Sequence, residues 1–295
     1  MLTRFAPAPT GYLHLGHVAS ALFVWGIGRR HGARVLMRIE DHDRQRCRPE
    51  YEGALLDDLD WLGFRPDVGA TVTFRAGPSQ FRQSDSGSAY EASVAALVAR
   101  GHQVYACACS RTRSADGAEG GAARSGAYPG TCRHRGLEPG RGRGLRMVLP
   151  EGVEQFEDLR LGPVEQEPER QCGDLLIRDR LGNWTYQFAV VVDDMRHGID
   201  LVIRGEDLLD STGRQLLLAR MLGRQAPPRF FHHPLIRKPS GEKLSKAARD
   251  ASVRDRRAGE SKPEDLIGEA LAAVGLLPAP RAVSLEDAIG MIANG

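Results

Sequence analysis

The stretch from Arg4 to His17 constrains the fold of this chain more than any other. A short apolar strand runs into Pro and Gly residues and then into His14-Leu15-Gly16-His17, where a helix begins. The first N–H groups of a helix lack intrahelical partners and attract phosphate. His14 and His17 could donate to phosphate oxygens, and Gly16 lets a flat base approach the backbone. The apolar stripe that indicates the helix consists of Leu15, Val18, Leu22 and Trp25.

A second short motif lies near the other end of the chain. Lys243-Leu244-Ser245-Lys246 follows the turn Pro239-Ser240-Gly241, and it places two ammonium groups on one loop. The chain has four lysines, and three of them fall between residues 238 and 246, so a compact ammonium is favoured there. Such a loop could neutralise charge that develops on a phosphate. The alternative is an ordinary solvated turn.

The apolar patterns between these motifs predict an α/β protein. They indicate helices over residues 51–62, 86–100 and 211–222, a buried strand over 34–39, and a second one in the run 201–207, which ends in charged residues. The apolar run 186–194 ends in carboxylates, as these strands do, and we interpret it as another buried strand. Strands that return after an insertion indicate a parallel sheet that is interrupted and resumed.

Two charged residues at the ends of these strands are candidate ligands. Glu40 could bind a cationic amino group, because the carboxyl ends of strands face the ligand crevice in such sheets. Its alternative role is a solvated turn. Arg204 could hold a carboxylate in a bidentate contact, or it could form a surface ion pair with Glu206 or Asp207.

Three of the five cysteines bracket a stretch rich in Gly, Ala and Ser. Cys107, Cys109 and Cys132 are the thiols that a closed tetrahedral zinc site prefers. The fourth ligand would be Tyr128 or His134, and ordinary zinc chemistry prefers the histidine. The alternative is three unrelated buried cysteines. Cys47 and Cys172 are expected to be packing residues.

The overall charge limits the classes of partner. The formal net charge is +2, so a global basic field for nucleic acid is absent and any RNA contact must be local. The first residues lack the apolar core of a signal peptide, and the apolar run 188–192 is too short to cross a bilayer. We therefore expect a cytoplasmic protein with no membrane partner.

Taken together, these blocks resemble the class I glutamyl-tRNA synthetases. His14-Leu15-Gly16-His17 is similar to the family's HIGH signature, and Lys243-Leu244-Ser245-Lys246-Ala247 is similar to its KMSKS signature. Four further blocks match the family in order, and the similarity covers nearly the whole chain, to about residue 275. The resemblance is closest to a shortened group of the family that glutamylates queuosine in tRNA(Asp). The further blocks are Arg4-Phe5-Ala6-Pro7, Arg38-Ile39-Glu40-Asp41, Thr185-Tyr186-Gln187-Phe188 and Ile203-Arg204-Gly205-Glu206-Asp207.

The resemblance implies a fold and a domain order. It implies a Rossmann-type catalytic core in two halves, 1–101 and 175–237. Between them lies a zinc-containing, acceptor-binding insertion, 102–174. Residues 238–295 would carry the lysine motif and a short helical stem-contact region.

The resemblance also implies residue roles. ATP, with Mg²⁺, would bind at His14, Gly16, His17 and Lys246, and Lys243 would join the two histidines and Lys246 in catalysis. Zinc would bind Cys107, Cys109, Tyr128 and Cys132, which favours Tyr128 over His134. L-glutamate would bind at Arg4, Ala8, Glu40, Tyr186 and Arg204.

The chain departs from the family in three respects. Ala8 stands where the family usually has serine, and the lost hydroxyl contact would weaken glutamate binding by about 1 kcal/mol. The stretch between Cys109 and Tyr128 is long and low in complexity. Only 49 residues follow Lys246, too few for the helical anticodon-binding domain of a discriminating synthetase.

We expect the protein to be a monomer. Two other functions are the alternatives to the glutamylation of queuosine. One is a synthetase core that charges the 3′ end of tRNA(Glu), and the other is an inactive tRNA-binding module.

Overall fold

The computed structural model describes residues 1–109, 127–236, 252–259 and 261–295. The chain divides into two compact units. The first consists of Met1–Asp85, Ile199–Leu209 and Pro228–Gly295, and the second of Ser86–Gly198 and Asp210–Pro227. The predicted domain boundaries near residues 101, 174 and 237 stay a prediction. Within the described ranges, no helix is long and apolar enough to cross a membrane.

Parallel strands form the centre of the first unit. β1 (Leu2–Phe5) pairs with β2 (Arg34–Met37), and β8 (Leu201–Gly205) pairs with β9 (Arg229–His233), both in parallel. The Asp200 N–H donates to the Leu2 carbonyl at 2.9 Å, and the Arg4 guanidinium reaches the Ile203 carbonyl, so β8 runs beside β1 in the same direction. Residues that follow these strands therefore meet at one edge, as predicted for an α/β sheet.

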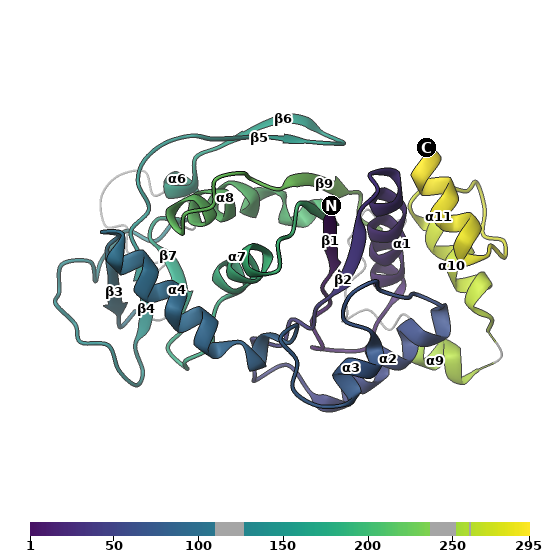
Figure 1. The fold of residues 1–295 in the computed structure, drawn as a ribbon, viewed down its shortest axis with the longest axis horizontal. Helices are drawn as coiled ribbons and strands as arrows, with labels where there is room; N and C mark the ends of the chain where they lie inside the picture. Colours follow the sequence, from purple (N-terminus) through teal and green to yellow (C-terminus); the bar gives the residue numbers. More distant parts are fainter. Residues whose placement is uncertain (110–126, 237–251, 260) are drawn as a thin grey trace. The chain divides into compact units, whose positions relative to one another are not determined.

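Helices cover these strands. α1 (Leu15–Arg30) is the most buried of them, and it packs against α10 (Pro263–Ala273) and α11 (Leu285–Asn294), as Figure 1 shows. A Cβ on Gly26 would lie 2.5 Å from Ile292, so a glycine is required where α1 and α11 touch. The other helical segments of this unit are α2 (Pro49–Leu62), α3 (Thr71–Arg75), η1 (Gln83–Asp85) and α9 (Val253–Ala258), and η2 (Glu206–Ser211) leads from it into the second unit.

The second unit combines an antiparallel sheet with helices. Its sheet has the order β3 (Val104–Cys107), β4 (Gly144–Met147) and β7 (Leu175–Arg178). β5 (Glu154–Asp158) and β6 (Gly162–Gln166) form a hairpin. The helices are α4 (Gly87–Ala99), α6 (Pro168–Cys172), α7 (Tyr186–Arg196) and α8 (Thr212–Met221), and their core includes the fully buried Tyr90, Phe188 and Leu218.

The prediction of a strand over residues 186–194 is wrong, because this run is the helix α7. Phe188 and the valines that follow it are buried on all sides by α4, α8 and β7. A helix that is buried all round has no polar face, so its sequence lacks the 3.6-residue period and is similar to a buried strand. The carboxylates at its end also differ from the prediction. Asp193 is buried and accepts a hydrogen bond from the Tyr90 hydroxyl at 2.8 Å.

The other predicted elements are confirmed. α1, α2, α4 and α8 lie where the apolar spacing indicates helices, and β2 and β8 lie in the predicted strands. The parallel partner of β8 is β9, which follows α8 in the chain. The resumed parallel pairing therefore exists, although its second strand lies downstream of the predicted one.

Candidate functional site

The two histidines of the first motif cap helix α1. The Gly16 N–H donates to Nδ1 of His14 at 3.1 Å, and the His14 N–H donates to Nδ1 of His17 at 3.1 Å. The two rings lie with their centroids 4.0 Å apart. When neutral rings accept at Nδ1, their protons sit on Nε2, the atom that can donate toward a phosphate oxygen.

Gly16 has a local role that the sequence did not reveal. A Cβ at this position would lie 2.9 Å from Cε1 and 3.1 Å from Nδ1 of His14. The absence of a side chain therefore allows the His14 ring to fold back over the first turn of α1. The sequence predicts that this glycine lets a base approach the backbone, and the contact with His14 adds a second requirement for it.

Charged side chains gather at the carboxyl edge of the strands in the first unit. Arg4, on β1, and Arg204, on β8, are both buried, and Arg4 donates to the Ile203 carbonyl at 3.2 Å. Glu40 follows β2, and its N–H donates to the Pro7 carbonyl at 3.0 Å, next to the half-buried Ala8. Three of the predicted glutamate-binding side chains and the Ala8 backbone thus come from strand ends of one unit.

Glu40 is neither a solvated turn nor a lone carboxylate. It is buried and accepts a hydrogen bond from the guanidinium of Arg38 at 2.7 Å, and Arg38 is itself fully inaccessible to solvent. The guanidinium thus holds the Glu40 carboxylate in place at the end of β2. Arg38 belongs to the block Arg38-Ile39-Glu40-Asp41 that resembles the family, but the sequence did not predict that its side chain would hold Glu40.

Arg204 also has a partner that the sequence did not suggest. Its Nε donates to Nε2 of His232 at 3.0 Å, and the two residues lie opposite each other in the β8–β9 register. His232 is fully buried and stacks on Phe230, with ring centroids 5.9 Å apart. Since Nε2 accepts here, the ring of His232 is neutral in this arrangement and holds the plane of the Arg204 guanidinium.

The segment that follows the lysine motif lies against the histidine motif. The buried Val253, at the start of α9, donates its N–H to the Leu13 carbonyl at 2.8 Å. The guanidinium of Arg254 covers the ring of Tyr12 at 4.7 Å from its centroid. Lys243 and Lys246 lie outside the described residues.

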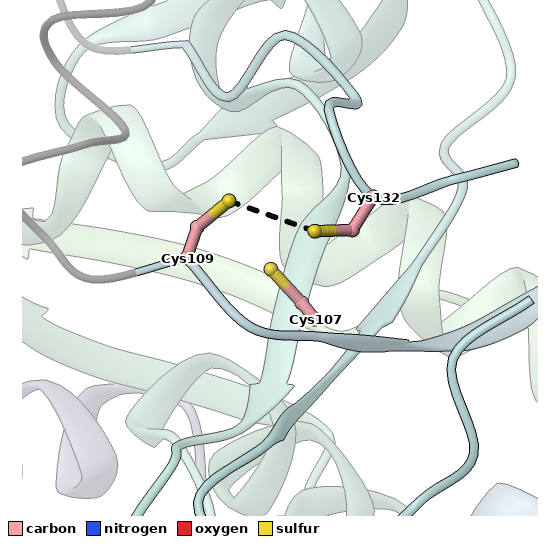
Figure 2. A group of neighbouring side chains, drawn as sticks. All are labelled: Cys107, Cys109 and Cys132. Atoms are coloured by element: carbon pink, nitrogen blue, oxygen red, sulfur yellow. Dashed lines mark hydrogen bonds between the residues drawn. The ribbon is translucent and has the colours of Figure 1, made fainter. Parts of the chain in front are cut away.

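The three predicted cysteine ligands converge in the second unit. The sulfurs of Cys107, Cys109 and Cys132 all lie within 4.8 Å of one another, and those of Cys109 and Cys132 are 3.6 Å apart (Figure 2). Zinc–sulfur bonds of about 2.3 Å in a tetrahedron separate two sulfurs by about 3.8 Å. The Cys109–Cys132 distance therefore matches that of two sulfurs on one zinc ion.

The hydroxyl of Tyr128 occupies the fourth side of this cluster. It lies 3.4 Å from the sulfur of Cys107 and 3.7 Å from that of Cys109, and it accepts the Cys132 N–H at 3.0 Å. His134 is exposed and does not belong to the cluster of described ligand atoms. This arrangement favours Tyr128 over the histidine that ordinary zinc chemistry prefers.

The cluster alters the acidity of its own groups. Burial raises the pKa of Cys132, but hydrogen bonds from the Ala108 backbone and the Tyr128 hydroxyl outweigh this and lower it to about 7. Burial raises the pKa of Cys109 and that of Tyr128. One thiol is thus ready to act as a thiolate, which is the form that binds metal.

Tyr186 belongs to the second unit. It is the first residue of α7, is half-buried, and follows Thr185, whose hydroxyl donates to the Leu176 carbonyl at 2.7 Å. The start of α7 is therefore tied to β7.

Comparisons with known proteins agree with these features. The family model "tRNA synthetases class I (E and Q), catalytic domain" matches residues 1–282. A relative from Symbiobacterium thermophilum named "Glutamyl-Q tRNA(Asp) synthetase" is 40% identical over 97% of this chain and 90% of its own length. The chain belongs to the glutamyl-Q tRNA(Asp) synthetase family. The resemblance predicted from the motifs is confirmed.

Other relatives of this family extend the comparison. A Glutamyl-Q tRNA(Asp) synthetase from Nitratidesulfovibrio vulgaris is 36% identical over 99% of the chain and 91% of its own length. A glutamate–tRNA ligase from Symbiobacterium thermophilum is 38% identical over 90% of the chain, which spans only 56% of that ligase. The solved structure of a glutamate tRNA ligase from Elizabethkingia meningosepticum, in complex with its amino acid, matches with a TM-score of 0.75 and 26% identity. That match covers 98% of this chain and 64% of the ligase. The class I aminoacyl-tRNA synthetase fold is thus confirmed.

Proposed function

We propose that this protein activates L-glutamate with ATP and Mg²⁺ and transfers the glutamyl group to queuosine in tRNA(Asp). The observation that carries the proposal is the 40% identity, over nearly the full length of both chains, to a relative named for this activity. The joint placement of the histidine motif and the buried charged strand ends in the first unit supports it.

ATP would bind at the start of α1. His14 and His17 would donate to phosphate oxygens, Gly16 would lie beneath the base, and Lys243 and Lys246 would neutralise the charge on the phosphates. The contact between Val253 and Leu13 supports this grouping, because Val253 follows the lysine motif by seven residues. Catalysis would then consist of positioning and charge stabilisation without a covalent enzyme intermediate.

Glutamate would bind at the adjacent strand ends. Arg4 and Arg204 would hold carboxylate, and Glu40, held in place by Arg38, would bind the α-ammonium group. Ala8 would contribute only its backbone where a serine would add a hydroxyl. Tyr186 completes the set that the family resemblance implies.

The reaction would proceed in two steps. An oxygen of the glutamate α-carboxylate forms a bond to the α-phosphorus of ATP, and the bond to the bridging oxygen breaks, which releases pyrophosphate and leaves glutamyl-adenylate. A hydroxyl of the queuosine cyclopentenediol then attacks the glutamyl carbonyl carbon. AMP leaves, and the hydroxyl proton passes to solvent.

The cysteine cluster would hold one zinc ion. Cys107, Cys109, Tyr128 and Cys132 fit it, because the three sulfurs lie within 4.8 Å of one another and the Tyr128 hydroxyl faces the sulfurs of Cys107 and Cys109. A metal there would tie residues 107–109 to residues 128–132 and would be structural. It would lie in an acceptor-binding insertion over residues 102–174.

Pyrophosphate exchange tests the first step. With the purified protein, ATP and labelled pyrophosphate, we expect label to enter ATP when L-glutamate is added and no tRNA is present. L-glutamine and L-aspartate serve as controls. The variant His17→Ala should lose most of the exchange. Absence of exchange would support an inactive tRNA-binding module, and exchange driven by a different amino acid would exclude the proposed substrate.

Transfer of labelled glutamate tests the second step. The acceptors are tRNA(Asp) with queuosine, the same tRNA without queuosine, and tRNA(Glu). We expect label only on the first. Label on tRNA(Glu) would instead support a glutamyl-tRNA synthetase core. Gel filtration with light scattering checks the predicted monomer.

A further inference from the structure

Tyr128 is held in place along its whole length. Its N–H donates to the Cys172 carbonyl at 3.0 Å, and its hydroxyl accepts the Cys132 N–H at 3.0 Å. Next to it, Gly173 has a φ of +62°, and a Cβ there would lie 1.9 Å from the Tyr128 carbonyl oxygen. Backbone contacts thus fix both ends of the tyrosine, but they leave the face of its ring to be held by another group.

Arg146, on β4, covers that face. Its guanidinium carbon lies 3.6 Å from the centroid of the Tyr128 ring, which is van der Waals contact and well inside the range of a cation–π interaction. One terminal nitrogen of the guanidinium donates to the Asp174 carbonyl at 2.7 Å. The Nε atom of Arg146 is buried without a hydrogen-bond partner among the described residues. A buried unpaired donor costs free energy, so the ring contact and the bond to Asp174 must maintain this conformation.

The support of Arg146 is itself rigid. The carboxylate of Asp174 is fully buried, and it accepts two hydrogen bonds from Arg133, at 2.6 and 3.1 Å, and one from the hydroxyl of Tyr105. The backbone oxygen that receives Arg146 therefore belongs to a residue fixed by three side-chain contacts. The stack on Tyr128 is built on this anchor.

We propose that Arg146 is a positioning residue for the metal site. It holds the ring of Tyr128 so that the tyrosine hydroxyl stays at the fourth corner of the cysteine cluster. The inference rests on the proposed zinc site. Three thiolates and a phenolate around Zn²⁺ carry a net charge of −2, and the cation of Arg146 partly neutralises it. Without Arg146, the tyrosine can leave the corner, and zinc is held by three cysteines alone.

Zinc retention measures this role without recourse to activity. Zinc content is determined by mass spectrometry, and its affinity and release are followed with a chromogenic chelator. We expect about one zinc ion in the wild-type protein and, in Arg146→Met, zinc affinity lower by about 10–100-fold, the range for lost outer-shell contacts. Arg146→Lys should fall between the two, because it keeps the charge but not the planar stack.

A matched control exists in the same unit. The guanidinium of Arg178 lies 4.9 Å from the ring centroid of Trp184 and donates to Glu91 and to the Gly182 carbonyl, so Arg178→Met removes a comparable stack made with a different aromatic ring. It should release zinc at the wild-type rate. Far-UV circular dichroism of every variant checks that the fold is retained.

A double-mutant cycle separates positioning from general stability. If Arg146 acts through Tyr128, adding Arg146→Met to Tyr128→Phe should cause little further loss of zinc affinity. Additive losses, or wild-type release from Arg146→Met, would overturn the inference and leave the zinc proposal intact. Absence of zinc from the wild-type protein would remove the site itself and the inference with it.

Discussion

The main-chain N–H of Val253 donates to the carbonyl oxygen of Leu13 at 2.8 Å. This bond joins the residue directly before the histidine motif to the first residue of α9, which follows the lysine motif in the sequence. The two residues are 240 positions apart in the chain, and both are buried. The two motifs that resemble the nucleotide-binding signatures of the family are therefore connected through the backbone of a single unit.

Arg254 strengthens this connection, and its removal should weaken ATP binding. Its guanidinium covers Tyr12 and donates to the Tyr12 hydroxyl, an exposed contact with an energy of about 1 kcal/mol. We predict that Arg254→Ala raises KM for ATP about fivefold in pyrophosphate exchange, while KM for glutamate stays the same. Arg256→Ala is the control, because Arg256 pairs with Glu269 instead. Equal effects of the two substitutions would contradict this role.

Gly16→Ala should reduce the rate of exchange with little effect on stability. The new Cβ would push the ring of His14 from its capping position, and small misplacements of catalytic groups are costly. We predict a loss of about 10–100-fold in kcat, with Tm lowered by a few degrees at most. Gly53→Ala, in α2, is the control, since nothing lies within 4 Å of its Cβ. Wild-type kcat in Gly16→Ala would show that the His14 ring tolerates the shift.

His232→Leu should raise KM for glutamate. The substitution removes the acceptor of the buried Arg204 Nε, which costs about 1–3 kcal/mol, or roughly 5- to 150-fold in affinity. His232→Gln keeps an acceptor and should recover most of the loss, and KM for ATP should stay unchanged in both. The prediction depends on the proposed contact between Arg204 and glutamate. A change in KM for ATP alone would point to a different role for this pair.

Asp58 should make stability depend on pH. Burial raises the pKa of this carboxyl to about 6, and its ion pair with Arg257, at 3.0 Å, offsets the shift only in part. Because the folded chain holds this proton more tightly than the unfolded chain, the contribution of Asp58 to stability falls as the pH rises from about 4 to about 6. The unfolding free energy of the wild type, relative to that of Asp58→Asn, should fall by about 3 kcal/mol across this window.

Urea unfolding at a series of pH values measures this effect. Asp43→Asn is the contrasting control. Burial raises the pKa of Asp43, but its hydrogen bonds with Arg46 outweigh this and lower it. Its contribution to stability should therefore be lost as the pH falls. Parallel stability curves for the wild type and Asp58→Asn would show that the Asp58 carboxyl keeps the same affinity for its proton on folding.

Much of the local structure could be predicted from the sequence. Helix α2 has a regular apolar spacing, a proline at its first position and Gly63 at its end, and these signals act within a few residues. The cysteine cluster was predictable because thiol chemistry limits what three neighbouring cysteines can bind. The family was predictable because several short blocks occur in a specific order.

The sequence by itself therefore determined the elements whose stabilising contacts are local, together with the family to which the chain belongs. The tertiary structure alone decided that residues 186–196 form a helix, that Glu40 pairs with Arg38, that His232 orients Arg204 and that Arg146 covers Tyr128. The reason is that burial and side-chain pairing depend on strands and helices that are distant in the chain. They also depend on the rotamer that each side chain adopts, and the spacing of residues in the sequence does not determine that rotamer. Such contacts exist only once the chain has folded.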